Sequence, residues 1–431
     1  MTLSELGRIV KGCMFGRDME FFDISIDSRE IKGGELFVAI RGERFDGHDF
    51  ALSALEKGAV AVLGERKFNA SCVVVGDTVS ALLRWAKYKR ENFSGEVVGV
   101  LGAAGKTTTK SMLAWVFEKF YKITYSPKSF NNFIGLSTTI IKANGNEDFW
   151  ILEIGANRVG EIGKLAKISR PNHLIYARLG PEHVEGFGST RNAVMEEYSA
   201  IPFSDGIILI NSESPYFPDG RFYTYGFSNA DFLGRNLRIS EDGVRFEFEG
   251  VEFFISYPHL GFAENALAVA AFSKLMGLPL KEVAEILKDY RGERMRMERF
   301  RCGNFEVISD VYNSNPISVD VILRSVYMVY KGKRVVFVFG DMLELGEEAE
   351  FWHRWVGRKM CLYGISAVVG FGELSRFVLE EAKACGLETF LARSHKECSE
   401  FVLNGNYDVV LVKGSRGMEM ERVVEELCSS T

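Results

Sequence analysis

The chain has 431 residues, 47% hydrophobic and 26% charged, which exceeds the roughly 250–300 residues that one hydrophobic core serves, so two or three domains are expected. A formal net charge of −6 gives no basic field and excludes a general nucleic-acid-binding surface. No apolar run approaches the ~20 residues of a membrane span and no signal-peptide pattern opens the chain, so a cytoplasmic protein is expected.

The first segment of the chain reads as a small α/β unit. Residues 35–40 form an apolar run of strand length, and residues 78–88 have the spacing of a helix. Residues 91–95 combine Glu, Asn, Ser and Gly, which is typical of a linker. We therefore expect a first domain over residues 1–92.

The next apolar run, residues 96–101, leads into a glycine-rich turn and then into a helix-forming segment. Gly99, Gly102 and Gly105 precede Lys106 in a Gly-x2-Gly-x2-Gly-Lys-Thr pattern, whereas the common phosphate-binding loop reads Gly-x4-Gly-Lys. In such a turn the backbone N–H groups hold phosphate, the lysine reaches the β- and γ-phosphates, and a threonine holds Mg²⁺. An ordinary turn with a solvated lysine is the alternative. The pattern favours nucleotide binding by Gly102, Ala103, Ala104, Gly105, Lys106, Thr107 and Thr108.

Short apolar runs alternate with helical segments through the rest of the chain. Strands are expected over residues 149–154, 174–176, 206–210, 335–339 and 409–412, and a helix over 263–276. The charged segment 288–301, before another strand at 306–309, predicts a second boundary. The alternation predicts an α/β chain with mainly parallel sheets. We divide it into domains 1–92, 93–297 and 298–431.

The seven cysteines are odd in number and form no Cys-x2-Cys pair. This arrangement indicates neither a disulfide framework nor a zinc site. Buried free thiols are expected.

Polar motifs follow the predicted strands in a set order along the chain. The most distinctive are Glu153-Ile-Gly-Ala-Asn157, Tyr312-Asn-Ser-Asn315-Pro and Gly340-Asp-Met-Leu-Glu344-Leu-Gly. The others are Asp27-Ser-Arg29, Asp46-Gly-His48, Phe130-Asn-Asn-Phe-Ile-Gly-Leu, Gly180-Pro-Glu-His183-Val-Glu-Gly-Phe-Gly188-Ser and Lys413-Gly-Ser-Arg416. Each motif is weak alone, but together and in this order they resemble the Mur ligase family.

The resemblance implies a three-domain α/β fold, in which a small N-terminal α/β domain and a Rossmann-like C-terminal domain flank a central P-loop domain with a parallel sheet. It implies ATP-dependent ligation of D-alanyl-D-alanine to UDP-N-acetylmuramoyl-tripeptide through an acyl phosphate, with Mg²⁺ as cofactor. A monomer with no nucleic-acid partner and no membrane span is the matching expectation. Positioning and electrostatics would supply nearly all the catalysis, since no protein nucleophile is needed.

Four residues of the central domain are expected at the centre of phosphoryl transfer: Lys106, Glu153, His183 and Asn157. Glu153 and His183 each follow a predicted strand, at the sheet edge where open α/β sheets bind ligands. With Thr107 they are expected to hold Mg²⁺. A salt-bridged or helix-capping carboxylate and a structural loop histidine are the alternatives for Glu153 and His183.

Some positions depart from the family pattern. The resemblance implies a lysine after Gly188-Ser whose carbamate supplies a metal ligand, but the chain has Glu196 and Glu197 there. We expect one of these two carboxylates to replace the carbamate. A solvated helix face is the alternative. Arg178 and Glu182 also stand where the family usually has an asparagine and a small residue.

The resemblance assigns the remaining site residues to three groups. On the ATP side they are Asn265, Arg296 and Asp310, although the usual histidine before Asn265 is replaced by Gly261, and His259 lies two residues away. On the UDP-substrate side they are Ser28, Arg29, Asp46, Gly47, His48, Asn131 and Asn132. The alternative for Ser28 and Arg29 is a surface turn with an ion pair, and for the asparagines a turn or helix cap. On the dipeptide side they are Tyr312, Asn313, Asn315, Asp341, Glu344, Lys413 and Arg416.

Two other functions stay open. A relative that adds one amino acid, such as a tripeptide synthetase or a folylpolyglutamate-type ligase, differs in the amine it accepts. A nucleotide-dependent switch or motor would turn over ATP without a UDP-sugar. Whether the tripeptide ends in lysine or in diaminopimelate does not follow from the sequence.

Overall fold

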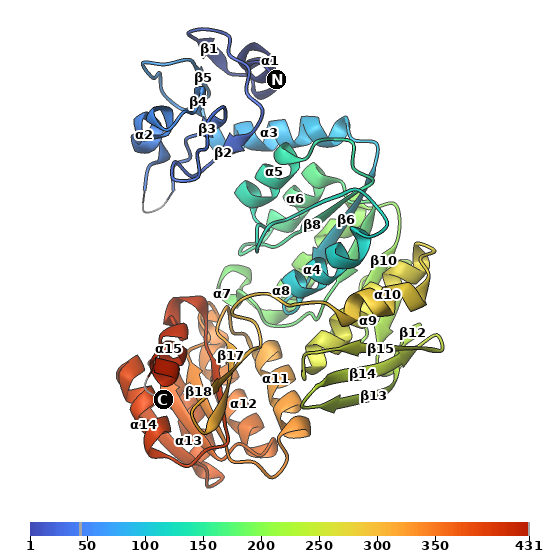
Figure 1. Ribbon diagram of the computed structural model, residues 1–431, viewed down its shortest axis with the longest axis vertical. Coiled ribbons are helices and arrows are strands. Elements are labelled where there is room, and N and C mark those ends of the chain that lie inside the picture. The colour runs from blue at the N-terminus through green and yellow to red at the C-terminus, as the bar shows by residue number, and fades with distance from the viewer. Residues whose placement is uncertain (43–44, 430–431) are drawn as a thin grey trace.

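A computed structural model describes residues 1–42 and 45–429. Three α/β units follow one another along the chain, from the N-terminal unit at the top of Figure 1 to the C-terminal unit at its base. β5 ends at Val74 and β6 begins at Glu96, so the expected boundary near residue 92 falls between two sheets. β16 begins at Glu298, beside the second expected boundary.

The N-terminal unit is a five-stranded sheet in the order β1-β5-β4-β3-β2, parallel except for the β1–β5 pair. Its strands are β1 (Cys13–Phe15), β2 (Ile24–Ser25), β3 (Leu36–Val38), β4 (Ala61–Gly64) and β5 (Cys72–Val74). Its helices are α1 (Leu3–Val10), α2 (Ala51–Glu56) and α3 (Thr78–Glu91), with a 3-10 turn η1 (Gly47–Phe50). Helix α3 packs on both α1 and α5, and so joins this unit to the next.

The central unit is a seven-stranded parallel sheet in the order β12-β11-β10-β9-β6-β8-β7. Its strands are β6 (Glu96–Leu101), β7 (Ile123–Tyr125), β8 (Phe149–Glu153), β9 (His173–Tyr176), β10 (Ile208–Asn211), β11 (Tyr223–Gly226) and β12 (Phe232–Leu233). Its helices are α4 (Lys106–Phe117), α5 (Phe133–Lys142), α6 (Glu161–Ser169), α7 (Val184–Phe187), α8 (Thr190–Glu197), α9 (Leu260–Leu275) and α10 (Leu280–Lys288), with the 3-10 segment η2 (Tyr198–Phe203).

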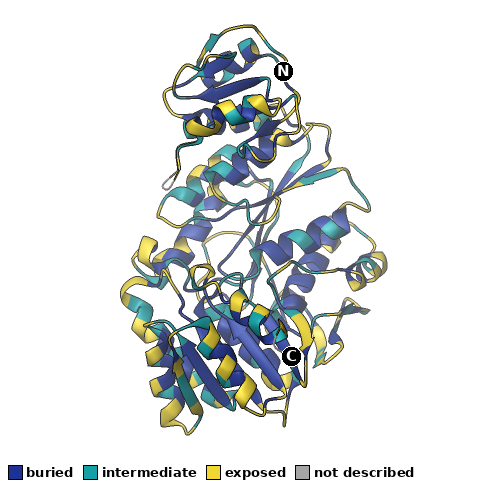
Figure 2. Cartoon of the chain, turned by 60° about the vertical axis from the view of Figure 1, so that its left-hand side comes forward, coloured by how far each residue is buried: buried dark blue, intermediate teal, exposed yellow. Residues whose placement is uncertain are grey.

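Strand β6 shows why the central sheet is buried on both faces. Successive side chains of a strand point to opposite faces. Val98 and Val100 pack into a cluster with α4 and α9, whereas Val97 and Leu101 pack into a cluster with α5 and α6. Figure 2 shows the result, with dark-blue strands inside and helices whose outer faces are exposed.

A small antiparallel sheet was not expected from the sequence. Its strands are β13 (Arg235–Ser240), β14 (Gly243–Phe248) and β15 (Val251–Ile255), paired in that order. Phe246, Phe248 and Phe253 pack its inner face against α9. Helix α9 is therefore buried on nearly all sides.

The C-terminal unit is a six-stranded sheet in the order β16-β17-β21-β18-β19-β20, in which only β16 is antiparallel among the described strands. Its strands are β16 (Glu298–Cys302), β17 (Phe305–Asp310), β18 (Val335–Gly340), β19 (Ala367–Phe371), β20 (Glu388–Ala392) and β21 (Val409–Lys413). Its helices are α11 (Pro316–Val329), α12 (Ala349–Leu362), α13 (Ser375–Ala384), α14 (His395–Asn404) and α15 (Glu421–Ser429), with the turns η3 (Gly346–Glu348) and η4 (Arg416–Met418).

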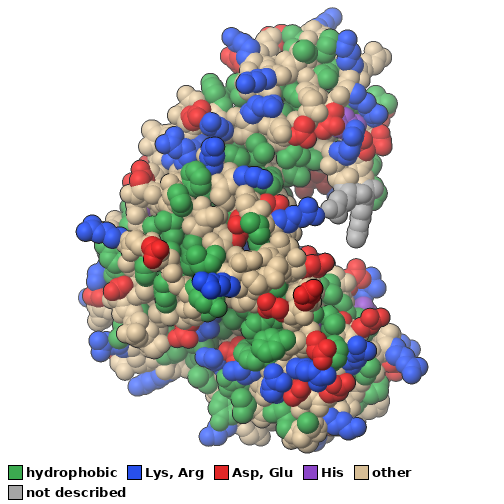
Figure 3. All heavy atoms as spheres, turned by 180° about the vertical axis from the view of Figure 1, so that it is seen from behind, with side chains coloured by type: hydrophobic (Ala, Val, Ile, Leu, Met, Phe, Trp, Pro, Cys, Tyr) green, Lys and Arg blue, Asp and Glu red, His purple; other side chains and the backbone are tan. Residues whose placement is uncertain are grey.

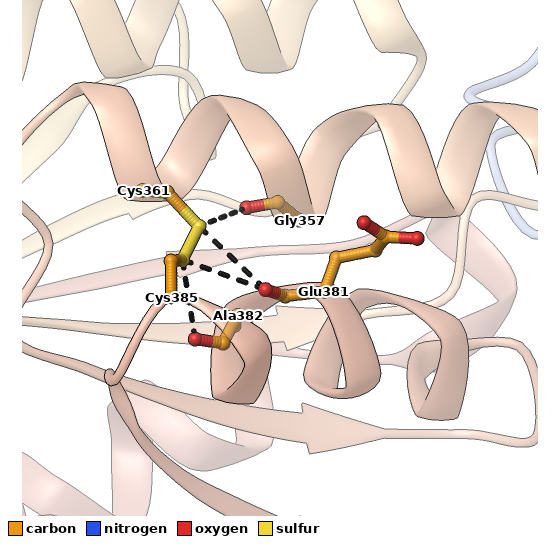
Figure 4. The surroundings of a disulfide bond; sticks show 5 residues. All are labelled: Gly357, Cys361, Glu381, Ala382 and Cys385. Atoms are coloured by element: carbon orange, nitrogen blue, oxygen red, sulfur yellow. Dashed lines mark hydrogen bonds between the residues drawn. A yellow bond between two sulfur atoms is a disulfide. The ribbon is translucent and has the colours of Figure 1, made fainter.

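Two disulfides lie in the C-terminal unit, so the expectation of free thiols is wrong for four of the seven cysteines. One joins Cys302 of β16 to Cys428 of α15, and the other joins Cys361 of α12 to Cys385 just beyond α13 (Figure 4). Each pair is far apart in sequence, by 126 and 24 residues, yet the Cα atoms lie 4.9 and 6.2 Å apart. The fold, and no spacing pattern, brings them within bonding distance.

No helix in the described ranges is long and apolar enough to cross a membrane.

Candidate active site

The glycine-rich turn after β6 forms the floor of a cavity of about 290 Å³. Gly102 and Gly105 have φ angles of 125° and 94°, which favour glycine, and Gly105 is the N-cap of α4. The Ala103 and Ala104 amides donate to the Arg178 carbonyl, at 2.7 and 3.0 Å. Lys106 and the N-terminus of α4 therefore face the cavity from a loop that its neighbours hold in place.

Lys106 already has a carboxylate partner. Its Nζ lies 2.7 Å from Glu182 Oε2 and also contacts the Gly102 carbonyl oxygen. Burial opposes the charge of Lys106, but the carboxylates of Glu182 and Glu197 outweigh it and raise the pKa of the ammonium group. Lys106 is thus protonated and held at the N-terminus of α4, facing the cavity.

Glu153, at the end of β8, is 1% exposed and lines the same cavity. Its Oε1 accepts a hydrogen bond of 3.1 Å from Asn131 Nδ2, and its Oε2 lies 3.4 Å from Lys110 Nζ without accepting a hydrogen bond. Lys110, four residues after Lys106, also contacts the Lys128 carbonyl oxygen, and burial lowers its pKa. Sequence reasoning missed Lys110, although the four-residue spacing from Lys106 on one helix was a signal for it.

His183 connects the central unit to the C-terminal unit. Its φ of 49° turns the chain sharply between β9 and α7, and its Nδ1 lies 2.6 Å from Glu344 Oε2. Burial opposes the charge of His183, but the contact with Glu344 raises its pKa. The Glu185 amide also donates to the Glu344 carbonyl at 3.0 Å, so Glu344 braces this turn.

The structure separates the two glutamates that could replace a carbamate. Glu196 Oε1 accepts from the amides of Gly160 and Ile162, at 2.9 and 3.1 Å, and so caps α6. Glu197 Oε2 accepts from the Gly102 amide at 2.9 Å, directly behind the phosphate loop. Burial raises the pKa of Glu197 to about 7. Both side chains are buried, which rules out the solvated helix face.

Residues of the C-terminal unit and of the segment before it close the cavity from the other side. Arg296 Nη2 donates to Thr107 Oγ1 at 3.1 Å, and its guanidinium lies 4.1 Å from the centre of the Tyr312 ring. Lys413 Nζ lies 2.5 Å from Asp310 Oδ2; burial opposes ionisation of Asp310, but Lys413 lowers its pKa. The lining from this side comprises Arg296, Asp310, Tyr312, Asn313, Asn315, Ser318 and Lys413.

Asn315 joins the two units at the phosphate loop itself. It is the N-cap of α11, accepting from the Ser318 amide, while its Nδ2 donates to the Ala103 carbonyl at 3.0 Å. The Tyr312-Asn-Ser-Asn315-Pro motif therefore places the N-terminus of α11 against the glycine-rich loop that precedes Lys106.

A second, smaller cavity of about 80 Å³ shares Gly105 and Arg296 with the first and is also lined by Thr108, Asn265 and His259. His259 is buried, its ring nitrogens have no hydrogen-bond partner in the described structure, and burial lowers its pKa to about 4. Arg178 and Glu264 form a buried two-contact ion pair in the wall, with both N–O distances 2.6 Å. These partners explain why Arg178 departs from the family pattern: its counterion is Glu264 on α9.

Several expected site residues do not line the 290 Å³ cavity. Asn132 caps α5 by accepting from the Gly135 amide, and Asp341 accepts from the Leu374 and Ser375 amides at the start of α13. Arg416 is exposed and pairs with Glu421 at 2.7 Å. In these contacts Asn132 and Asp341 hold the starts of helices, and Arg416 forms a surface ion pair.

The expected residues of the N-terminal unit also have partners of their own. Arg29 is exposed and forms an ion pair with Asp27, in which Nη2 lies 2.6 Å from Oδ2. Ser28 lies between them in the same turn. His48 is buried between Asp46 Oδ1, 2.5 Å from its Nδ1, and the Glu65 amide, which donates to its Nε2 at 2.8 Å. Gly47 packs so closely on Ile40 that an added Cβ would lie 2.6 Å from the Ile40 backbone. His48 and Gly47 thus shape this loop.

The donor set of the cavity fits a hard divalent cation. Glu153 Oε2 is a buried carboxylate oxygen with no hydrogen-bond donor, and Thr107 Oγ1 lies at the start of α4. The described residues contain no group of three or more His, Cys, Asp or Glu side chains that could hold a metal by themselves. Mg²⁺ usually binds through one or two protein oxygens together with phosphate and water, and Glu153 Oε2 and Thr107 Oγ1 are oxygens of that kind.

Comparison with known proteins places these features in a family. Models described as "Mur ligase family, catalytic domain", "Mur ligase middle domain" and "Mur ligase, glutamate ligase domain" match residues 22–92, 100–273 and 295–416. A UDP-N-acetylmuramoyl-tripeptide–D-alanyl-D-alanine ligase from Escherichia coli is 32% identical, over 99% of this chain and 98% of that protein. The chain belongs to the Mur ligase family. A Mur ligase of the same name from Bacillus subtilis is 29% identical, over 100% of this chain and 98% of its own length.

Solved Mur ligases share the whole architecture. A crystal structure of MurF from Acinetobacter baumannii superposes with a TM-score of 0.90 at 23% identity and covers 99% of this chain and 98% of its own. MurF from Thermotoga maritima in complex with ADP superposes with a TM-score of 0.82 at 26% identity, covering 94% and 97%. The expected family and its three-domain α/β fold are confirmed.

Proposed function

We propose that this chain is an ATP-dependent ligase that joins D-alanyl-D-alanine to UDP-N-acetylmuramoyl-tripeptide, releasing ADP and phosphate. The observation that carries the proposal is the full-length similarity to the Escherichia coli ligase of that name, at 32% identity. The site supports it, because a glycine-rich loop and a half-buried lysine face a cavity closed by a second unit. We also propose that the chain is a cytoplasmic monomer; the family resemblance implies the monomer.

The reaction runs in two steps. A carboxylate oxygen of the tripeptide attacks the γ-phosphorus of ATP, the bond to the β–γ bridging oxygen breaks, and an acyl phosphate and ADP form. The amine of the dipeptide then attacks the acyl carbon, loses a proton and expels phosphate. Lys106 and the N-terminus of α4 stabilise the transferring phosphoryl group, while Arg296 approaches it from beside Thr107.

We propose Thr107 and Glu153 as the residues that hold Mg²⁺, with His183 at the rim. Glu197 would replace the charge of the carbamate but not its contact with the metal, because it accepts from the Gly102 amide behind the loop and does not line the cavity. When bound, Mg²⁺ neutralises charge on the phosphates. Lys110 and Asn131 orient Glu153, Lys110 by its ion pair with Oε2 and Asn131 by its hydrogen bond to Oε1. Asn157 lines the same cavity and is proposed to contact the substrate.

The substrate would bridge the units. Seen from behind, the molecular surface is hollowed between the N-terminal unit and the C-terminal unit, and acidic side chains gather on the lower rim (Figure 3). We propose that the UDP end lies against the turn of Ser28 and Arg29 and the loop of Asp46, Gly47 and His48. The peptide end then reaches Glu153, and the dipeptide enters beside Tyr312, Asn313 and Lys413.

The test is a reconstitution with mass detection. The purified chain is incubated with ATP, Mg²⁺ and UDP-N-acetylmuramoyl-tripeptide, with D-alanyl-D-alanine or single amino acids as the amine. We expect ADP release and a product heavier by one dipeptide only when both substrates are present.

A product heavier by one amino acid would assign the chain to a single-residue ligase. ATP turnover without either substrate would indicate a switch. Substrates ending in lysine and in diaminopimelate, compared side by side, define the third residue.

A further inference from the structure

Glu182 occupies the place where a phosphate would meet the lysine of the loop. Its Oε2 lies 2.7 Å from Lys106 Nζ, and its Oε1 lies 3.9 Å from His183 Nε2. The Lys106 and Glu182 side chains are 12% and 13% exposed, so water screens the pair weakly. A carboxylate on this lysine carries the same sign of charge as the phosphate that has to replace it.

The other cations of the cavity are also neutralised. Besides Lys106 with Glu182, Lys413 in the lining pairs with Asp310, and Lys110, which lies outside the lining, pairs with the lining residue Glu153. Among the described residues that line the cavity, Arg296 is the one cation with no carboxylate ion pair. A nucleotide without a metal ion thus meets carboxylates that already hold the lysines, and its phosphates are repelled in a site of low dielectric.

We infer that Glu182 is an internal anion that holds Lys106 until a nucleotide arrives together with a divalent cation. When the phosphates displace Glu182 from Lys106, the Glu182 carboxylate loses its positive partner. A divalent cation that enters with the phosphates supplies new positive charge in its place. Glu182 therefore makes tight nucleotide binding conditional on the cation. The inference rests on the proposed function, because it concerns the nucleotide site of that reaction.

The backbone around Glu182 can support such a displacement without disturbing the loop. Gly180 and Pro181 precede it, and the Arg178 carbonyl holds the Ala103 and Ala104 amides independently of the Glu182 side chain. The phosphate loop therefore keeps its shape when the carboxylate turns away. Only the side chain has to move.

The experiment measures the affinity for ADP by calorimetry, once with EDTA and once with excess Mg²⁺, for the wild-type chain and for Glu182→Gln and Glu182→Ala. Glutamine keeps the shape of the side chain and removes its charge. The control is Glu185→Gln, which removes the same charge from an exposed residue three positions along. We expect both Glu182 variants to bind metal-free ADP about tenfold or more tightly than wild type, and the gain in affinity on adding Mg²⁺ to shrink by the same factor.

Glu185→Gln is expected to behave as wild type. Metal-free affinities of the Glu182→Gln variant within twofold of wild type, or a parallel loss of affinity in both conditions, would overturn the inference and leave Glu182 a structural partner of Lys106. A wild-type chain that binds ADP in neither condition would overturn the proposed function as well. A wild-type chain that ligates normally beside unchanged variants would overturn the inference alone.

Discussion

The buried ion pair between Arg178 and Glu264 provides a sharp test of the structure. Both side chains are largely buried, with exposed fractions of 11% and 6%, and two N–O contacts of 2.6 Å join them. Removing one partner leaves an unpaired buried charge, which typically costs about 3–5 kcal/mol, whereas replacing both by apolar residues is often nearly neutral. Single variants Arg178→Met and Glu264→Leu should therefore each be much less stable than the double variant.

The magnitude can be converted to a melting temperature. For a unit of 150–250 residues, about 1 kcal/mol lowers the midpoint by roughly 2–4 °C, so each single variant should unfold about 6–20 °C below wild type. The double variant should recover most of that loss. Differential scanning calorimetry of the four proteins measures the difference. The Arg178 carbonyl still accepts from the Ala103 and Ala104 amides in every variant, because these contacts involve only the backbone. Single-variant shifts below about 2 °C, or losses that simply add in the double variant, would refute the reasoning.

Three further predictions follow from other parts of the molecule. His259 has a pKa of about 4, below its ordinary value of about 6.5, so the unfolded chain takes up the proton first as the pH falls. Stability should drop by at most about 3 kcal/mol between pH 6.5 and 4, and urea unfolding of His259→Gln should show a smaller drop; an identical pH profile contradicts this. In denaturant, thiol titration should count three free cysteines without reductant and seven with it, and seven in both conditions would disprove the disulfides. Lys106→Met should slow substrate-dependent ADP release at least about 100-fold, with the circular dichroism spectrum unchanged; a rate near wild type would remove Lys106 from the phosphate site.

The sequence was sufficient for the features that short segments determine. The glycine spacing before Lys106 predicts a tight turn with positive φ angles, which glycine adopts most easily. Gly102 and Gly105 have such angles. The apolar runs predicted the parallel strands, because a strand buried on both faces has few polar residues. Glu153 and His183 were predicted at the sheet edge, and the structure places both in the lining of one cavity.

The partners of these residues could not be predicted in the same way. Lys106 meets Glu182, and His183 meets Glu344, across 76 and about 160 residues of chain, and such pairs depend on how whole units pack. The β13–β15 sheet was missed because its exposed face breaks up the apolar runs that marked the other strands. The disulfides were missed for the same reason as the ion pairs, since they join segments that only the fold brings together.

The contacts between the central and C-terminal units suggest how the site is opened. Asn315 of the C-terminal unit donates to the Ala103 carbonyl, and Arg296, in the segment just before that unit, donates to Thr107. Glu344 of the C-terminal unit contacts His183, so polar groups hold both the loop and the turn at His183. Polar contacts exchange with water more readily than a fully apolar interface does, because water can satisfy both partners after they separate. Closing them around bound substrates would exclude water from the acyl phosphate, which hydrolyses otherwise. If Lys106 and Thr107 bind the nucleotide as proposed, the contacts that Arg296 and Asn315 make on the same loop would link nucleotide binding to closure of the C-terminal unit.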